Sequence, residues 1–381
     1  MAHIENLTLS QFRSYAELTL RGLEPHSVVL SGPNGVGKTN ILEALSLLAT
    51  GRGLRGAKLS ELQHKDADIP WIIAAKLQTQ FGSLQAGIKR ERGKEKKMLR
   101  LNGESAKNQT VLAEWCSVLW LTPQMDGLFL ESVSARRRFF DRLVFTFDPG
   151  HSGRLTRYEN AVSQRNKLLK DGSGDPAWFD GLERQIAETG VAIAASRRIY
   201  IDRLMRTYQI ATEEESREFP QASVMIKGKI EACLEHYSAL EAEEKFIEML
   251  RQSRARDSML GVTSEGVHRS DIHVSYAAKD MPAAQSSTGE QKALLIGILL
   301  SHARLLKQTN GEAPILLLDE VVAHLDPRRR KVLANILKSY GSQVWMTGTD
   351  AALFSDFEAQ HLSLPLNHLR QESERLLPCT D

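Results

Sequence analysis

The chain begins with hydrophobic patterns that are typical of β-strands. Apolar and polar residues alternate over 4–9 and 16–20, and a short apolar run over 27–31 leads through a glycine-rich stretch into helical spacing over 39–48. Further strands are predicted over 71–79, 83–89, 97–101 and 117–121. This part of the chain therefore combines a sheet-forming region with one strand–loop–helix unit.

The period of the pattern changes to that of helices after Ser134. Residues 148–150 (Asp-Pro-Gly) interrupt it, and residues 151–266, rich in Glu, Arg, Ala and Leu, keep helical spacing. A loop is predicted over 171–176, and Phe219-Pro220 is predicted to end a long helix. Because sustained heptads are missing, the pattern predicts a helical lobe and not a long coiled-coil arm.

Composition narrows the possible number of domains and kinds of partner only slightly. With 381 residues, 42% hydrophobic and 25% charged, the chain is an ordinary globular one with two domains, or one domain with a large insertion. The formal charge of +2 is nearly neutral, so any contact with nucleic acid must come from local basic clusters. Cys116, Cys233 and Cys379 lack the spacing of metal or redox sites and are expected to be reduced thiols.

Neither a membrane span nor a secretory signal is visible in the sequence. No stretch approaches the roughly 18 apolar residues that a bilayer requires. The first residues lack a basic region followed by an apolar run. We therefore expect a cytoplasmic protein with no membrane partner.

Residues 32–39 match the phosphate-binding pattern G-x-x-x-x-G-K-[ST]. The glycines of such a loop let backbone N–H groups surround phosphates, and the following helix points its positive dipole end at them. Lys38 is expected to reach the β- and γ-phosphates, and the Thr39 hydroxyl to bind Mg²⁺. The nucleotide-binding residues expected here are Gly32, Pro33, Asn34, Gly35, Val36, Gly37, Lys38, Thr39 and Asn40.

An apolar strand pattern over 315–318 ends in two carboxylates, Asp319 and Glu320. An uninterrupted apolar run is typical of a buried strand in a parallel sheet, and ligands of such sheets bind beyond the carboxyl ends of the strands. Asp319 is expected to hold Mg²⁺ through water, and Glu320 to orient or deprotonate the attacking water. Strands often end in solvated acids, so this interpretation depends on the glycine loop.

The segment 287–291, Ser-Thr-Gly-Glu-Gln, opens a long apolar helical pattern. One interpretation is a helix cap, with Ser or Thr at the N-cap and Glu or Gln three residues later. The other is functional, because a helix N-terminus with the Ser287 hydroxyl and the Gly289 backbone suits a γ-phosphate from a second protomer. The two interpretations share the same geometry.

The order of these motifs resembles that of a split ABC-type ATPase head, an α/β fold. The glycine loop comes first, then a large insertion, the Ser-x-Gly helix and the acidic strand. Such heads work in pairs that close each other's nucleotide sites, so the order predicts an ATP-gated clamp. Residues 1–150 would form the N-terminal part of the head, 151–266 an inserted helical lobe, and 267–381 the C-terminal part, with a strand over 271–276.

Two further segments allow alternative interpretations. Gln124, directly after Thr122 and Pro123, is placed to contact Mg²⁺ or water, although loop glutamines are mostly solvated. Residues 324–326 (His-Leu-Asp) either cross a dimer interface or cap a helix, with Asp326 at the N-cap and a proline after it. Both roles of the second segment can hold together.

Basic residues gather in four places: Arg52 with Arg55, and the segments 89–100, 136–138 and 328–331. A single run of this kind is more commonly a solvated face than a DNA site. Several runs on one side of a dimer would follow DNA phosphates with strong salt dependence. The sequence does not place them on a common face.

Segments along nearly the whole chain resemble the RecF family of SMC-like ABC ATPases. Residues 9–15 are similar to its opening motif L-x-x-F-R-N-Y, and residues 134–141 to its P-x-x-R-R-x-F-L-D helix. These two motifs are specific to the family, whereas the loop at 32–40 is shared by many ATPases. Residues 158–169 resemble its Y-x-x-x-L-x-x-R-N-x-L-L helix, and 318–329 its acidic strand and D-loop.

The resemblance implies a slow, DNA-stimulated ATPase switch without nuclease activity, which uses ATP and Mg²⁺ and dimerises on ATP. It implies binding of double-stranded, gapped and single-stranded DNA, action with RecR and in the RecO pathway to load RecA at gaps, and support of replication restart and the SOS response. By the same resemblance, Glu320 is the catalytic acid, Ser287 contacts the γ-phosphate of the partner protomer, and Arg13 lies near the nucleotide.

The sequence departs from the family pattern at several positions. Ser14 replaces the usual Asn, Ser134-Ala135 stands where Pro is common, and Gln124 stands where an acidic residue is frequent. Transporter ATPases carry a switch histidine after the strand that follows the acidic pair, but residues 344–350 offer only threonines there. This difference fits a slow switch better than a fast motor.

Three other classes of protein fit less well. Transporter-type subunits have a much shorter spacing between the loop and the Ser-x-Gly motif. A nuclease of the ATPase-plus-Toprim type needs a further acidic domain, for which the stretch after Asp350 is expected to be too short. A structural pair-of-arms protein would need the missing heptads.

Overall fold

The structure, a computed structural model, describes residues 2–49, 51–106, 110–172 and 175–365. Cys379 and two residues of the loop expected over 171–176 lie outside this part. The chain divides into two compact units, residues 1–125 with 306–381, and residues 126–305. These boundaries differ from those expected above, and the functional division into head and inserted lobe stays a prediction.

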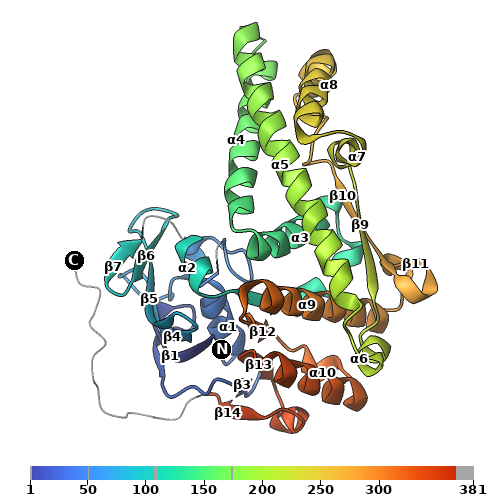
Figure 1. Ribbon diagram of the computed structural model, residues 1–381. Helices are drawn as coiled ribbons and strands as arrows, with labels where there is room; N and C mark the ends of the chain where they lie inside the picture. The colour runs from blue at the N-terminus through green and yellow to red at the C-terminus, as the bar shows by residue number, and fades with distance from the viewer. Residues whose placement is uncertain (1, 50, 107–109, 173–174, 366–381) are drawn as a thin grey trace. The chain divides into compact units, whose positions relative to one another are not determined.

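An antiparallel sheet of six strands forms one layer of the first unit, in the order β2-β1-β4-β5-β6-β7 (Figure 1). Its strands are β1 His3–Phe12, β2 Tyr15–Leu20, β4 Ile72–Thr79, β5 Gly82–Arg90, β6 Lys97–Leu101 and β7 Glu104–Ala106. Side chains alternate between a buried and a more exposed face, as in Leu7, Ile73 and Leu84, which are fully buried. The period-two pattern thus correctly predicts these strands, apart from the short β7.

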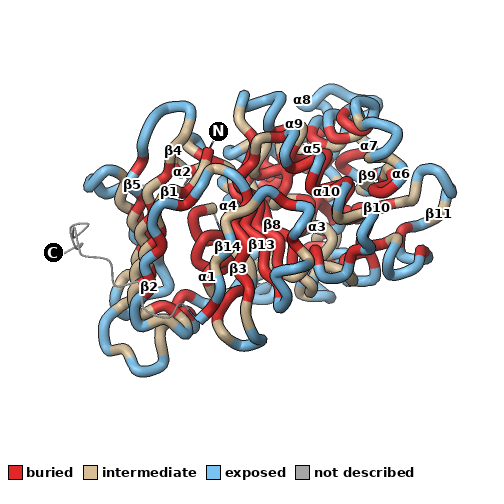
Figure 2. The backbone as a smooth tube through the Cα atoms, turned by 90° about the horizontal axis from the view of Figure 1, so that it is seen from below, coloured by how far each residue is buried: buried red, intermediate tan, exposed pale blue. Residues whose placement is uncertain are grey.

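A parallel sheet of five strands forms the second layer, in the order β14-β3-β13-β12-β8. Its strands are β3 Ser27–Ser31, β8 Val118–Leu121, β12 Ile315–Leu318, β13 Val344–Gly348 and β14 Ala359–Ser363. All residues of β3, β8, β12 and β13 are buried, and Figure 2 shows β3, β8 and β13 in red. The α/β fold class is confirmed, and the order sets the carboxyl ends of β3, β13 and β12 side by side.

The helices of the first unit are α1 Lys38–Ser46, α2 Thr110–Trp115 and α10 Pro327–Tyr340 among the described residues. Helix α1 follows β3 directly after the glycine loop, as predicted. Asp326 caps α10, because its side chain accepts a hydrogen bond from the backbone N–H of Arg329 at 3.0 Å and Pro327 occupies the first turn. The capping interpretation of this segment is therefore confirmed.

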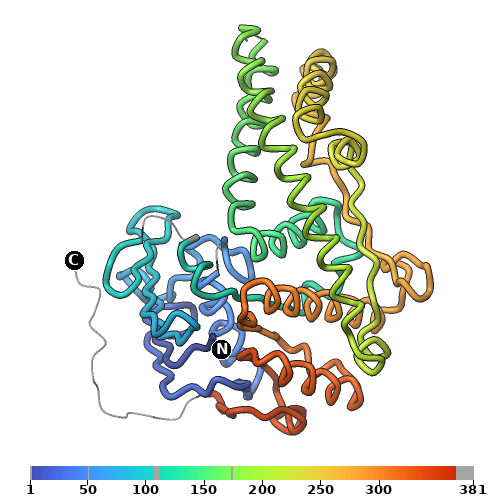
Figure 3. The backbone as a smooth tube through the Cα atoms, viewed as in Figure 1, coloured from blue at the N-terminus to red at the C-terminus, as the bar shows by residue number. Residues whose placement is uncertain are grey.

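The second unit is mainly helical (Figure 3). Its helices are α3 Val133–Phe147, α4 Gly150–Asp171, α5 Pro176–Tyr208, α6 Glu213–Glu218, α7 Lys229–His236, α8 Ala239–Leu260 and most of α9 Thr288–Asn310. Helices α4 and α5 lie side by side, and α8 packs on both. Tyr158, Ile186 and Phe246 form part of their common core. No helix in the described ranges is long and apolar enough to cross a membrane.

A small sheet in this unit corrects the prediction of an all-helical segment at 151–266. Strand β9 Ala222–Lys227 pairs antiparallel with β10 Asp271–Tyr276, which in turn pairs with β11 Met281–Pro282. Pairing with a strand that lies far along the chain left no local signal in the sequence. The long helix α5 also ends at Tyr208, and a short capped helix, α6, precedes Phe219-Pro220.

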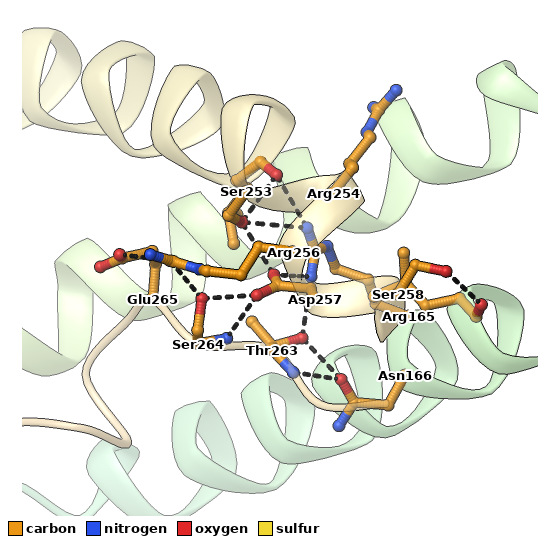
Figure 4. Close-up of polar contacts among 12 residues, drawn as sticks. Arg165, Asn166, Ser253, Arg254, Arg256, Asp257, Ser258, Thr263, Ser264 and Glu265 are labelled. Atoms are coloured by element: carbon orange, nitrogen blue, oxygen red, sulfur yellow. Dashed lines mark hydrogen bonds and ion pairs between the residues drawn. The ribbon is translucent and has the colours of Figure 1, made fainter. Parts of the chain in front are cut away.

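Arg165 joins three helices of the second unit (Figure 4). Its fully buried guanidinium donates to Glu183 on α5 at 3.0 Å and to Asp257 on α8 at 2.7 Å. It also donates to the Thr263 hydroxyl at 3.0 Å, and Asn166 accepts hydrogen bonds from the amide and hydroxyl of Thr263. The Arg-Asn pair of the segment 158–169 thus has a structural role in this unit.

Candidate functional site

The glycine loop connects β3 to α1 and holds Lys38 against its own backbone. Lys38 is 5% exposed, and its Nζ donates to the carbonyls of Gly32 at 2.6 Å and Pro33 at 2.9 Å. Gly37 has φ 104°, and a Cβ at this position would lie 2.6 Å from the hydroxyl of Tyr15. Glycine is therefore required here both by backbone conformation and by close packing.

The loop and the acidic strand meet in one direct contact. The Thr39 hydroxyl at the start of α1 donates to Asp319 Oδ1 at 2.9 Å. Asp319 directly follows β12 and is 6% exposed. Although 280 positions separate the two residues, the sheet order brings them together. This juxtaposition is the one that the two motifs require if they act on the same ligand.

Glu320 is held in an unusual backbone conformation beside Asp319. Its φ is 54°, in the left-handed region that few residues other than glycine adopt. Its backbone N–H donates to the Thr347 hydroxyl at 2.9 Å, and that hydroxyl donates to Asp319 Oδ1 at 2.8 Å. Thr347 lies in β13, the strand between β3 and β12. The sequence pattern singled out the threonines of this segment but assigned them no contact.

Arg13 lies near the loop helix but is engaged by a carboxylate that the sequence analysis missed. Its guanidinium forms a two-pronged pair with Glu43 on α1, at 2.7 and 2.8 Å. Arg55 adds a third hydrogen bond to Glu43 at 2.9 Å. Glu43 is 1% exposed, and the signal that could have found it is an acid on the apolar face of the helix at 39–48.

Asn40 lies in α1, the helix that follows the glycine loop, and Gln124 follows β8, the strand that pairs with β12. Asn40, in α1, donates to the Ser14 hydroxyl at 2.9 Å and accepts from Arg55 at 3.0 Å. Gln124 is exposed in a turn just after β8, the strand that pairs with β12. It therefore follows the strand next to β12, at the end of the sheet where Asp319 follows β12.

Ser287 belongs to the second unit and caps α9. Its amide and its hydroxyl each donate to Glu290 at 2.9 Å, and the amide of Glu290 donates back to the Ser287 hydroxyl at 3.4 Å. Lys279 also pairs with Glu290, and this contact, together with the bonds from Ser287, lowers the pKa of Glu290 to about 2. The capping interpretation is confirmed. Gly289 is exposed, and a Cβ there would meet no atom within 4 Å.

The residues of the first unit fit a nucleotide with its magnesium ion. The loop offers its backbone groups and Lys38, and Thr39 with Asp319 supplies a hydroxyl and a carboxylate. Within the described ranges there is no group of three or more His, Cys, Asp or Glu side chains that could hold a metal ion by themselves. Mg²⁺ usually takes one or two protein oxygens and completes its shell with phosphates and water, which matches this donor set.

Comparison with known proteins identifies the family. Residues 3–364 match the family model for the RecF/RecN/SMC N terminal domain. The DNA replication and repair protein RecF of Mesorhizobium japonicum is 47% identical over 368 residues, which cover 96% of each chain. The protein of the same name from Brucella suis is 46% identical over 355 residues, covering 92% of this chain and 91% of its own.

This chain belongs to the RecF family. A solved structure of the recombination mediator protein RecF-ATPrS in the RecFOR pathway has the same fold, with a TM-score of 0.83, 24% identity and coverage of 95% and 96% of the two chains. The Smc head domain of Pyrococcus furiosus, bound to the C-terminal domain of ScpA, matches with a TM-score of 0.52, 15% identity and coverage of 95% and 93%. The expected SMC-like head fold is therefore confirmed.

Proposed function

We propose that this RecF-family chain is an ATP-dependent DNA-binding switch of recombinational repair. The observation that carries the proposal is the contact between Thr39 and Asp319, which joins the phosphate loop to the acidic strand. The relatives that share close to half of its sequence are DNA replication and repair proteins. The family resemblance adds RecR as partner, the RecO and RecA pathway, and loading of RecA at single-stranded gaps.

The roles proposed at the nucleotide site follow from the side chains present. ATP would lie on residues 32–39, with Lys38 on the β- and γ-phosphates. Thr39 and Asp319 would hold Mg²⁺, which neutralises phosphate charge when bound. Glu320 orients or deprotonates the attacking water, and Gln124 offers a further polar contact beyond β8. A strained backbone at Glu320 supports this assignment, because such conformations concentrate at functional sites.

A second copy of the chain is proposed to complete the nucleotide site. The hydroxyl of Ser287 and the N-terminus of α9 would cap the γ-phosphate bound by the other protomer. Gly289 supports this role, because nothing within 4 Å in the described part of the chain requires a glycine there. A close approach by a second chain explains the missing side chain.

Contacts within each unit show which basic clusters are already engaged and which are available to contact DNA. Arg136 is bound by both oxygens of Asp271 at 2.8 Å, and Arg137 donates to the Ser270 carbonyl at 2.9 Å. Burial lowers the pKa of Arg137, as expected for a structural cation. Arg55 is bound to Glu43. These arginines stabilise their own units and are poor candidates for phosphate contacts.

The β5–β6 hairpin is the proposed DNA-binding surface. Residues 89–100 contain seven cationic and two acidic side chains. The strand register pairs Lys89 with Met98 and Gly87 with Arg100, so Lys89 and Arg100 share the more exposed face of the sheet. No acidic side chain in the described part of the chain pairs with either of them. Cations without acidic partners, next to a glycine that has no side chain, suit contact with the phosphate backbone of DNA.

The experiment that tests the proposed function is a light-scattering mass measurement. The wild type and Glu320→Gln are compared with and without Mg-ATP and a gapped duplex. The expected result is a doubling of mass on ATP, with DNA retained longest by Glu320→Gln because hydrolysis no longer opens the dimer. A persistent monomer, or equal DNA affinity with ATP, ADP and no nucleotide, would contradict the proposal.

A further inference from the structure

One threonine hydroxyl connects both acidic residues of the candidate site. We propose that Thr347 is the positioning residue that orients Asp319 toward the magnesium ion and fixes the backbone of Glu320. The proposal rests on the ATPase function proposed above and assigns a role within the same site.

The position of Thr347 follows from the order of the parallel sheet. Strand β13 runs between β3, which carries the phosphate loop, and β12, which carries the acidic pair. Register pairs Met346 with Leu318, so Thr347 lies level with Asp319. It also pairs with Leu30 of β3 and is 1% exposed. A side chain here can reach the acidic pair without meeting solvent.

The hydroxyl of Thr347 uses its donor and an acceptor position at once. It donates to Asp319 Oδ1 at 2.8 Å and accepts the backbone N–H of Glu320 at 2.9 Å. Asp319 Oδ1 also accepts from Thr39, whereas no residue of the described ranges donates to Oδ2. The carboxylate is therefore anchored through one oxygen and leaves the other for a cation.

Thr347 and Thr39 differ in what they do when a cation binds. The motif assigns the Thr39 hydroxyl to Mg²⁺, which would take it away from Asp319. Thr347 would then be the remaining hydroxyl on Oδ1. The same group satisfies the N–H of Glu320, whose φ of 54° must be maintained by its surroundings. Removing the hydroxyl disturbs both acids together.

The other threonine of the segment provides a control. Thr349 follows two residues later, is exposed, and belongs to no contact described at this site. The same substitution at Thr349 and at Thr347 changes the same atoms. A difference between the two variants therefore reports the position of the hydroxyl and not the loss of a threonine.

The test compares Thr347→Val, Thr347→Ser and Thr349→Val in the full chain. Titration calorimetry measures ATP affinity in EDTA and in Mg²⁺, and steady-state assays measure hydrolysis. For Thr347→Val we expect unchanged affinity in EDTA, a smaller gain on adding Mg²⁺, and hydrolysis reduced by about 10–100-fold, as for other groups that orient a metal ligand. Thr347→Ser should restore both quantities, and Thr349→Val should keep the wild-type gain in ATP affinity on adding Mg²⁺.

Several outcomes would overturn the proposal. They are a normal Mg²⁺-dependent gain in affinity for Thr347→Val, a failure of Thr347→Ser to restore it, or a larger loss for Thr349→Val. If Thr347→Val does not fold, Thr347→Cys, which keeps a weak donor, replaces it. A wild type that does not hydrolyse ATP refutes the proposed function instead, and the Mg²⁺-dependent affinity still decides the role of Thr347.

Discussion

At the scale of single residues, backbone strain and buried charge mark the region around the phosphate loop. Among the described residues other than glycine, five have positive φ, and two of them, Arg13 and Glu320, lie at the candidate site. Asn102, a third, belongs to the turn before Gly103 and is ordinary hairpin chemistry. Thr347 accepts the backbone N–H of Glu320, the Leu62 carbonyl accepts that of Arg13, and the buried Glu43 binds the Arg13 side chain.

Lys97 yields a prediction about pH. Leu47, Leu99 and Leu112 are among its neighbours, its Nζ is buried without a hydrogen-bond partner in the described part of the chain, and burial lowers its pKa from 10.5 to about 8. Between these values the unfolded chain binds a proton that the folded chain does not, so the free energy of unfolding should rise with pH from about 8 to 10.5.

Replacing Lys97 removes this dependence. We expect Lys97→Met to raise the free energy of unfolding at pH 7 by roughly 1–3 kcal/mol, because an unpaired charge no longer has to be buried. The measurement is chemical denaturation at several pH values, with the exposed neighbour Lys96→Met as control. A lower stability of Lys97→Met at pH 7 would contradict the interpretation.

At the scale of elements, ion pairs decide which helices and hairpins are structural and which are free to bind. The Arg165 network joins α4, α5 and α8 through side chains that are fully buried. The β5–β6 hairpin instead carries two partly exposed cations that lack acidic partners among the described residues, Lys89 and Arg100. Cationic side chains thus serve two purposes: a buried and paired one stabilises its unit, and those without acidic partners are available for binding.

The Arg165 network predicts a large loss of stability on truncation. Arg165→Met leaves the buried carboxylate of Asp257 without its cation and Glu183 with Arg254 alone, which should lower the free energy of unfolding by about 3–5 kcal/mol. Arg206→Met removes an exposed helical pair with Asp202 and should cost less than about 1 kcal/mol. Equal effects of both substitutions in urea denaturation would show that the network adds nothing.

The hairpin predicts a specific change in the salt dependence of DNA binding. Lys89→Gln and Arg100→Gln should weaken DNA binding in the ATP state, and the slope of log affinity against log salt should fall by roughly one for each phosphate that is no longer neutralised. Lys94→Gln is the matched control, because Lys94 lies in the same hairpin but is already paired with Glu91. Unchanged slopes for Lys89→Gln and Arg100→Gln would place the DNA surface elsewhere.

At the scale of the whole molecule, two copies of the chain are proposed to complete each other's nucleotide sites. Thr39, Asp319, Glu320 and Thr347 belong to the first unit, and Ser287 belongs to the second. In this structure Ser287 is engaged in its own cap with Glu290. If two copies complete each other's sites, Ser287 of one copy must reach the nucleotide that the other copy binds.

Complementation between two inactive variants tests this arrangement. Lys38→Ala should abolish ATP binding, and Ser287→Arg should block the capping surface, so each variant alone should not hydrolyse ATP. A mixture should regain part of the wild-type rate. In a mixed dimer, the intact loop of the Ser287→Arg protomer meets the intact Ser287 of the other protomer. No recovery on mixing, measured by steady-state hydrolysis, would contradict capping in trans.

Local patterns alone determined much of this fold and most of the candidate site. The strand over 27–31, the helix after Lys38 and the strand over 271–276 were predicted because apolar period and motif lie within a few neighbouring residues. Capping by Ser287 and Asp326 was likewise visible, because a cap involves residues three apart. The roles of these residues in catalysis stay predictions.

Tertiary structure decided what depends on residues far apart along the chain. The strand β9 was missed because its partner β10 follows only after two further helices. The engagement of Arg55 by Glu43 and of Arg136 by Asp271 separated structural arginines from the hairpin cations. Thr347 reaches the acidic pair only because β13 inserts between β3 and β12. Strand order and ion pairing are set by packing across the whole unit, so a local pattern cannot encode them.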